Sequence, residues 1–205
     1  MNVIEIVLFV LCFLAGSLPF AVWIGKLLYN KDVRQFGSGN PGATNTLRTL
    51  GPTPALIVLL LDIAKGMAGV LIPYFFYEGS LLLHEEAMAL GGGLSVLGHI
   101  FSPFLGFKGG KGVATTVGVM IALHSGIVIF VILSFALVLM LTKFVSLSSI
   151  VASVVYAVLV ILFRPESQFI IGFAIFVAAL VIYKHKANIN RLLHGEESKL
   201  SFRKS

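Results

Sequence analysis

Charged side chains are scarce in this sequence. Only 12% of its 205 residues are Asp, Glu, Lys or Arg, whereas 58% are hydrophobic, and soluble domains carry about 25% charged residues. The mean hydropathy is +1.00. These values exclude a water-soluble globular domain and predict an integral membrane protein.

Cysteine is almost absent as well. The single Cys12 lies within the first hydrophobic run, so the sequence offers neither a disulfide framework nor a cysteine zinc site. A basic segment, which a signal peptide carries at its start, is also missing before that run. Residues 1–5 include one acidic side chain and no basic one, and we therefore expect the first run to be retained as a membrane span.

Basic residues outnumber acidic ones and give the chain a net charge of +6. Such a balance is compatible with nucleic-acid binding, but here the basic residues lie in loops and in the C-terminal tail. The preference of membrane proteins for Lys and Arg on the cytoplasmic side explains this distribution better. We therefore expect no nucleic acid among the partners.

Five hydrophobic runs have about the length of one transmembrane helix, roughly 20 residues. A kink in the first run is expected at Pro19, because proline breaks the helical hydrogen-bond ladder and neighbouring groups must satisfy the backbone. The third run contains glycines at 91–93, which permit close helix packing. These five predicted spans cover residues 3–28, 55–76, 87–105, 146–163 and 168–183.

The region 113–141 is long for one span and short for two. Charge decides between them. Two crossings place 12 of the 13 Lys and Arg residues outside spans on one side, against Arg164 alone, whereas one crossing gives six against seven. Two crossings therefore satisfy the positive-inside rule and add predicted spans at 112–124 and 126–142.

The resulting prediction is an all-α fold: a polytopic bundle of seven transmembrane helices in a single membrane domain, 1–205. Its N-terminus lies outside and its C-terminus is cytoplasmic. Nearly every loop side chain capable of chemistry then faces the cytoplasm, where we expect these segments to meet in one anion-lined chamber. The cytoplasmic segments are residues 30–51, 106–112, 142–149 and 184–205.

The chain is organised around a loop at residues 107–116. It combines three glycines, Lys108, Lys111 and two threonines directly before a hydrophobic run. Glycine lets backbone N–H groups approach a ligand closely, and a helix N-terminus attracts anions. The stretch favours a phosphate site over the alternative, a flexible basic loop. An NTPase is not expected, because Gly112 follows Lys111 where a Walker sequence requires Ser or Thr.

The first cytoplasmic loop contains the dinucleotide pattern G-x-G-x-x-G at residues 37–42. That pattern requires a strand before it in a soluble βαβ unit; here a membrane span precedes it, so a dinucleotide site is rejected. What remains is a glycine-rich turn followed by Arg48, which binds phosphate bidentately. An ordinary turn shaped by Asn and Pro is the alternative. The side-chain donors of this turn are Ser38, Thr44 and Asn45.

Other polar residues leave two interpretations open. Serines within 146–149 either cap a helix or hold a second anion, and the basic tail after residue 184 is suited to anionic lipid.

Asp62 and Lys65 lie three residues apart within a span, where we expect them to neutralise each other rather than to act in catalysis. His99 is expected to be a hydrogen-bonded structural residue.

Taken together, these motifs resemble those of the bacterial acyl-phosphate:glycerol-3-phosphate acyltransferases, the PlsY family. The resemblance covers nearly the whole chain, with several motifs in order. It implies a multi-pass enzyme of the bacterial inner membrane that transfers a fatty acyl group from acyl phosphate to the first hydroxyl of glycerol 3-phosphate. The products are lysophosphatidic acid and phosphate. The matching stretches are 37–45, 98–99, 107–115, 146–149, Asp62 with Lys65 and Gly66, and His185 with Asn188, Arg191 and Glu197.

The resemblance also implies roles for the matched residues. We expect no metal and no cofactor, membrane lipid as a partner, and a functional monomer. The implied catalytic residues are Ser38, Arg48, Lys108, His185 and Asn188. The implied substrate- and phosphate-binding residues are Gly39, Asn40, Thr44, Asn45, Gly109, Gly110, Lys111, Gly112, Ser146, Ser148 and Glu197.

The acceptor of the hydroxyl proton stays open between His185 and a substrate phosphate. An acyl-enzyme on Ser38 is a third route, but serine without a neighbouring base is a weak nucleophile, so direct transfer is preferred. A transporter of anionic small molecules is the alternative function. Transporters usually carry inverted repeats, and the sequence has no convincing internal repeat. A structural scaffold would leave the motifs without a purpose.

Overall fold

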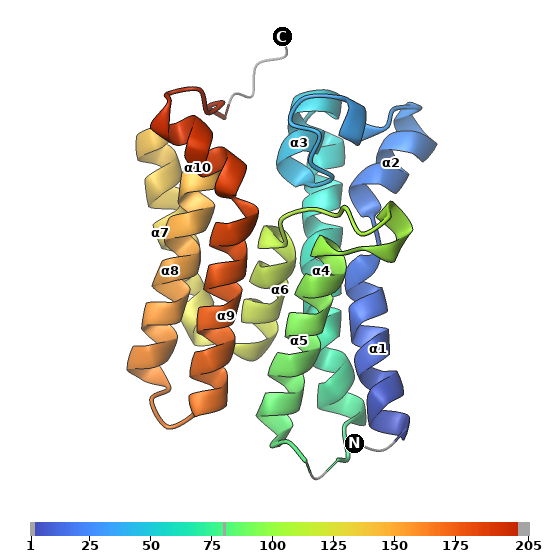
Figure 1. The fold of residues 1–205 in the computed structure, drawn as a ribbon, viewed down its shortest axis with the longest axis vertical. Helices are drawn as coiled ribbons and strands as arrows, with labels where there is room; N and C mark the ends of the chain where they lie inside the picture. The colour runs from blue at the N-terminus through green and yellow to red at the C-terminus, as the bar shows by residue number, and fades with distance from the viewer. Residues whose placement is uncertain (1–2, 80, 201–205) are drawn as a thin grey trace. The chain divides into compact units, whose positions relative to one another are not determined.

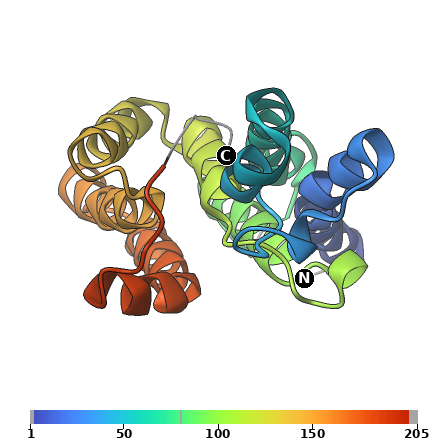
Figure 2. The same cartoon turned by 90° about the horizontal axis from the view of Figure 1, so that it is seen from above.

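The computed structural model describes residues 3–79 and 81–200, most of which are helical. These residues form two compact units, 3–123 and 124–200. Figures 1 and 2 show the helices of each unit from the side and along their length.

The first unit is built around its longest helix, α4, which packs against α1, α5 and α6. The short helix α3 and the loops before α3 and α6 lie at the same end of this unit (Figure 1). The helices of the unit are α1 (Val3–Ser17), α2 (Phe20–Tyr29), α3 (Ala43–Leu50), α4 (Pro52–Phe76), α5 (His84–Ile100) and α6 (Val113–Leu123), with single 3₁₀ turns η1 (Val33–Gln35) and η2 (Pro103–Leu105).

The kink predicted at Pro19 is present, as a break between α1 and α2 with a bend of 44°. Such a break leaves main-chain carbonyls without helical partners, and inside a membrane these need donors from neighbouring elements. Lys65 supplies one from α4: its Nζ donates to the carbonyl of Leu18 at 2.8 Å. The side chain of Lys65 therefore joins the two halves of the broken helix to the centre of the unit.

Helices α4 and α6 touch through their backbones. A Cβ atom added to Gly66 would overlap the carbonyl of Thr115, and one added to Gly118 would overlap the carbonyl of Ile63. Small residues at such crossings allow membrane helices to pack by van der Waals contact without a hydrophobic driving force. The loop that precedes α6 is thereby held at a fixed height on α4.

The second unit is a smaller bundle in which α8 packs against both α7 and α9. A bend of 57° separates α9 from the short amphipathic helix α10. The chain then turns back, and the N–H of Leu200 donates to the carbonyl of Lys143 at 2.7 Å. The helices are α7 (Ser125–Thr142), α8 (Val145–Phe163), α9 (Gln168–Lys184) and α10 (Lys186–Leu193).

Among the described residues, four helices are individually long and apolar enough to cross a membrane: α4, α5 extended through η2, α7 and α8. The number rises to six if each bent pair, α1 with α2 and α9 with α10, is one span. Helix α6 falls where the span 112–124 is predicted, but its 11 residues rise only about 16 Å at 1.5 Å each. A seventh crossing and the orientation of the bundle stay predictions.

Candidate active site

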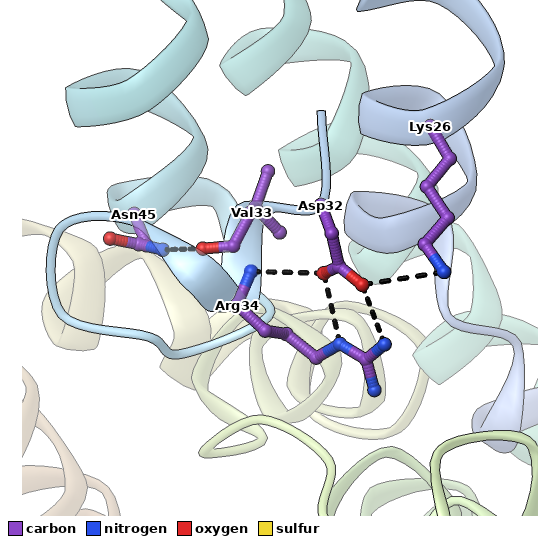
Figure 3. Close-up of polar contacts among 5 residues, drawn as sticks. All are labelled: Lys26, Asp32, Val33, Arg34 and Asn45. Carbon is purple, nitrogen blue, oxygen red and sulfur yellow. Dashed lines mark hydrogen bonds and ion pairs between the residues drawn. The ribbon is translucent and has the colours of Figure 1, made fainter. Parts of the chain in front are cut away.

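Asn45 organises the first cytoplasmic loop. Its side chain is 1% exposed, and its Nδ2 donates to the carbonyls of Val33 at 2.7 Å and Phe36 at 3.1 Å. Figure 3 shows the bond to Val33. Its Oδ1 accepts from the backbone N–H of Ser38 at 2.8 Å and from the Ser38 hydroxyl at 3.1 Å. Both N–H groups of the Asn45 amide, predicted as a phosphate donor, are thus used within the protein.

A cluster of charges lies on the same loop, and sequence reasoning missed it. Asp32 accepts from Arg34 through Nε at 2.9 Å and Nη2 at 2.6 Å, and Lys26 Nζ lies 3.3 Å away (Figure 3). These contacts, led by the Arg34 hydrogen bond, hold the pKa of the Asp32 carboxyl well below its ordinary range. Arg34 is therefore occupied by an acid, whereas the predicted Arg48 is exposed on the last turn of α3.

The other predicted residues of this loop lie close to Ser38 in the chain. Ser38 itself is exposed. Gly39 has a positive φ of 70° and donates its N–H to the carbonyl of Phe36 at 3.0 Å. Asn40 precedes α3, and Thr44 belongs to its first turn; both are partly buried. The turn is thus fixed by hydrogen bonds and is not an extended loop.

The glycine loop of residues 106–112 is bonded to the end of α5. The N–H of Gly109 donates to the carbonyl of Ile100 at 3.0 Å, and the N–H of Gly110 donates to that of His99 at 3.1 Å. The prediction offered these two N–H groups to a phosphate, but they satisfy carbonyls at the helix C-terminus instead.

Other donors remain at this loop. Lys108 is exposed, and Lys111 is partly buried. Gly112 is buried with a positive φ of 81°, directly before α6. The first N–H groups of a helix have no intrahelical acceptor, and together with its dipole they attract an anion. The start of α6 and the Lys108 side chain are therefore the groups of this loop that are chemically suited to an anion.

In the second unit, Glu197 connects three of its neighbours. Its Oε1 accepts from Ser146 Oγ and from Asn188 Nδ2, each at 2.7 Å, and its Oε2 accepts from Arg191 Nε at 2.7 Å. Burial raises the pKa of the Glu197 carboxyl, but the three hydrogen bonds together outweigh burial, so the pKa lies below its ordinary value. Sequence reasoning chose Ser146, Asn188 and Glu197 for a ligand; the structure shows them bonded to one another.

His185 stands at the bend between α9 and α10 and is 2% exposed. Its Nδ1 lies 2.8 Å from the carbonyl of Val181. Since a carbonyl only accepts, Nδ1 carries the hydrogen, and Nε2 is the basic nitrogen of the neutral ring. Ser148 donates its hydroxyl to the carbonyl of Phe144 at 2.8 Å, which is the back-bonding typical of serine in helices.

Within 3–79 and 81–200, no group of three or more His, Cys, Asp or Glu side chains is arranged to hold an ion.

Apolar helices with polar, basic connections define a multi-pass membrane protein. The family model of glycerol-3-phosphate acyltransferases matches residues 6–195. The chain belongs to this family, whose members are acyltransferases of phospholipid synthesis.

Relatives from several bacteria carry the same name, glycerol-3-phosphate acyltransferase. The protein of Listeria welshimeri is 41% identical over 98% of this chain and 100% of its own length. That of Staphylococcus saprophyticus is 40% identical over 96% and 98%. That of Syntrophomonas wolfei is 42% identical over 96% and 97%.

Two solved structures are similar throughout. Both are crystal structures of PlsY, an integral membrane glycerol 3-phosphate acyltransferase. The glycerol 3-phosphate form is 36% identical, with a TM-score of 0.87 and coverage of 96% of each chain. The lysophosphatidic acid form is 35% identical, with a TM-score of 0.84 and coverage of 97% of this chain and 96% of that one.

Proposed function

We propose that the acyl donor of this enzyme is a fatty acyl phosphate. The sn-1 hydroxyl oxygen of glycerol 3-phosphate attacks the acyl carbonyl carbon, an ester bond forms, and the bond from that carbon to the phosphate oxygen breaks. The products are lysophosphatidic acid and inorganic phosphate. The hydroxyl proton passes to a base of the protein or to a substrate phosphate.

The observation that supports the proposed acceptor and product is the pair of related crystal structures. That PlsY protein has been solved in a glycerol 3-phosphate form and in a lysophosphatidic acid form, which differ chemically by one acyl ester. We infer the same acceptor and product for this chain because the two proteins match over nearly their full lengths. An acyl phosphate donor suits a protein with two separate basic segments, since each reactant then carries a phosphate.

We assign the phosphate of the acyl donor to the first unit. Lys108 and the start of α6 would bind it, with Gly112 permitting the close approach, and Gly109 and Gly110 would shape the loop. Ser38, held by Asn45, would orient the phosphate and the developing oxyanion together with Thr44 and Arg48. Fixed donors of this kind stabilise charge in the transition state without reorganising.

We assign glycerol 3-phosphate to residues of the second unit. Its contacts would be Ser146, His185 and Asn188. Glu197 would not contact the phosphate, because a carboxylate repels it. Instead it would hold Ser146 and Asn188 in place. The neutral His185 ring would offer Nε2 as a proton acceptor, since histidine is the side chain most often used as a general base.

The Ser38 hydroxyl is poorly suited to an acyl-enzyme. Its hydrogen is directed at an amide oxygen of Asn45, and an amide oxygen is far too weak a base to activate serine. We therefore favour direct transfer between the substrates. The remaining parts of the proposal are a bacterial inner-membrane location, an active site on the cytoplasmic face, seven crossings and activity as a monomer.

A coupled assay tests the donor. Purified enzyme in detergent is given acyl phosphate with and without glycerol 3-phosphate, and released phosphate and lysophosphatidic acid are measured. We expect equimolar release of both only when the acceptor is present. Matched reactions receive acyl-CoA or an acyl carrier protein thioester. Transfer from a thioester but not from acyl phosphate would refute the proposed donor, and a transporter would release no phosphate in detergent.

A further inference from the structure

The centre of the first unit holds three ionisable side chains in contact. Asp62 and Lys65 of α4 and His99 of α5 are 2%, 5% and 7% exposed. Asp62 Oδ1 lies 2.8 Å from Lys65 Nζ and 3.6 Å from His99 Nδ1. The second distance is longer than a hydrogen bond and is an electrostatic contact. A small pocket is lined by these three residues together with Gly110 of the glycine loop.

Buried charge of this kind is costly inside a membrane and is retained where it serves a purpose. Sequence reasoning paired Asp62 with Lys65 and left His99 separate, because the spacing of α4 residues is visible in the sequence and a contact between α4 and α5 is not. Lys65 already has a second partner in the Leu18 carbonyl. Lys65 thus contacts the helix break, and Asp62 connects Lys65 with His99.

The glycine loop rests directly on His99. The backbone of Gly110 bonds to the His99 carbonyl, and the direction in which Gly110 would carry a Cβ points at the imidazole Nε2, at overlap distance. The equivalent direction at Gly109 points at the His99 main-chain carbonyl. His99 therefore requires glycine at two successive positions. Its side chain leaves no room for a Cβ at position 110, and its main-chain carbonyl leaves none at position 109.

We propose that Asp62, Lys65 and His99 form a positioning triad for acyl transfer. Asp62 and Lys65 fix the His99 ring, and the ring supports Gly110, which sets where Lys108 and the start of α6 present their donors. The triad does not touch the reacting atoms in this account. It rests on the proposed function, in which this loop binds the phosphate of the acyl donor.

The proposal is tested by rescue. Gly110→Ala is expected to lower kcat/KM for acyl phosphate by about 100-fold, the size of loss that an ångström-scale misplacement produces. Adding His99→Ala removes the ring against which the new methyl is forced, and at least about tenfold of the loss should return by the same argument. The matched control is Gly109→Ala with and without His99→Ala. Its clash is with backbone, so His99→Ala should restore nothing.

A failure to rescue Gly110→Ala, or equal rescue of both glycine variants, would overturn the triad. If Gly110→Ala does not yield folded protein, His99→Phe replaces it, since this variant keeps a ring beneath the loop and loses the nitrogen that faces Asp62. We expect its KM for acyl phosphate to rise about tenfold with little change in kcat, whereas an unchanged KM would refute the link to Asp62. Wild-type enzyme is assayed in parallel, and inactivity of the wild type with acyl phosphate would count against the proposed donor rather than the triad.

Discussion

Asn45 Oδ1 accepts two hydrogen bonds from Ser38, one from the backbone N–H at 2.8 Å and one from the hydroxyl at 3.1 Å. The amide that does so is buried and has no donor left for a substrate. A residue predicted to bind ligand thus holds a second predicted site residue, Ser38, in place. The two roles, binding a ligand and supporting Ser38, predict different effects when Asn45 is replaced.

Asn45→Ala should abolish most activity and also destabilise the protein. The change removes both bonds that Ser38 donates to Asn45 and leaves the carbonyl of buried Val33 with only a 3.4 Å bond from the N–H of Phe36. A buried polar group that is left poorly satisfied costs about 1–3 kcal/mol. Thr49→Ala is the control: Thr49 lies on the same helix and donates only to helix carbonyls. Thermal unfolding and turnover are measured together, and an Asn45→Ala protein of normal stability that has lost only substrate affinity would favour direct ligand binding.

Ser38→Ala should lose activity without affecting any covalent intermediate, since we expect none to form. Wild-type enzyme is incubated with radiolabelled acyl phosphate, denatured and washed, and the protein-bound label is counted. Label that persists in the wild type and disappears in Ser38→Ala would establish the acyl-enzyme route and refute direct transfer.

His185→Ala should reduce kcat by about 100-fold or more if the ring accepts the proton, in line with the usual contribution of general base catalysis. The variant should also lose the acidic limb of the pH–rate profile, on which wild-type activity rises as the essential base is deprotonated. Near-normal turnover of His185→Ala would leave a substrate phosphate as the acceptor.

Glu197 should make stability depend on pH in the acidic range. The pKa of its carboxyl in the folded protein lies below the ordinary value of 4.5, so the folded state favours the ionised form. Its contribution is complete above pH 4.5 and is lost as the pH falls through the lower, folded-state pKa. Glu197→Gln should therefore lower the melting temperature at pH 7, and its difference from wild type should shrink as the pH is lowered below 4.5. A difference that stays constant down to the acid limit would show that charge is not what Glu197 contributes.

Chelation should leave activity unchanged. We expect EDTA-treated enzyme, assayed in metal-free buffer, to release phosphate at the rate of untreated enzyme, because the proposed chemistry uses only protein and substrate groups. Loss of activity that returns on adding Mg²⁺ or Zn²⁺ would require a metal in the reaction.

Local chemistry made parts of the fold predictable. Pro19 removes a backbone donor within the first hydrophobic run, so the break between α1 and α2 was predictable from a single residue. The pair Asp62 and Lys65 was visible because three residues separate neighbours on one helix face. Family membership was predictable for another reason: the motifs are long and occur in a fixed order.

The partners of polar groups were not predictable in the same way. Glycines at 109 and 110 indicate that something approaches the backbone closely, but the sequence does not say whether it is a ligand or a carbonyl of α5. Glu197 meets Ser146 only because the tail folds back beyond α10, a path without periodicity. The extent of α6 also depended on packing, since glycine contacts with α4 support a helix shorter than a full span.

The bonds from Gly109 and Gly110 to the last carbonyls of α5 have a consequence for how the enzyme meets its donor. The loop has its shape before any substrate binds. The conformational entropy that is lost on ordering the loop is therefore lost during folding and not during binding. An acyl phosphate that binds at this loop, as proposed, would thus encounter a preformed site. In the proposed function, donor selectivity at this loop comes from shape and charge that are already in position, and not from closure of the loop around the substrate.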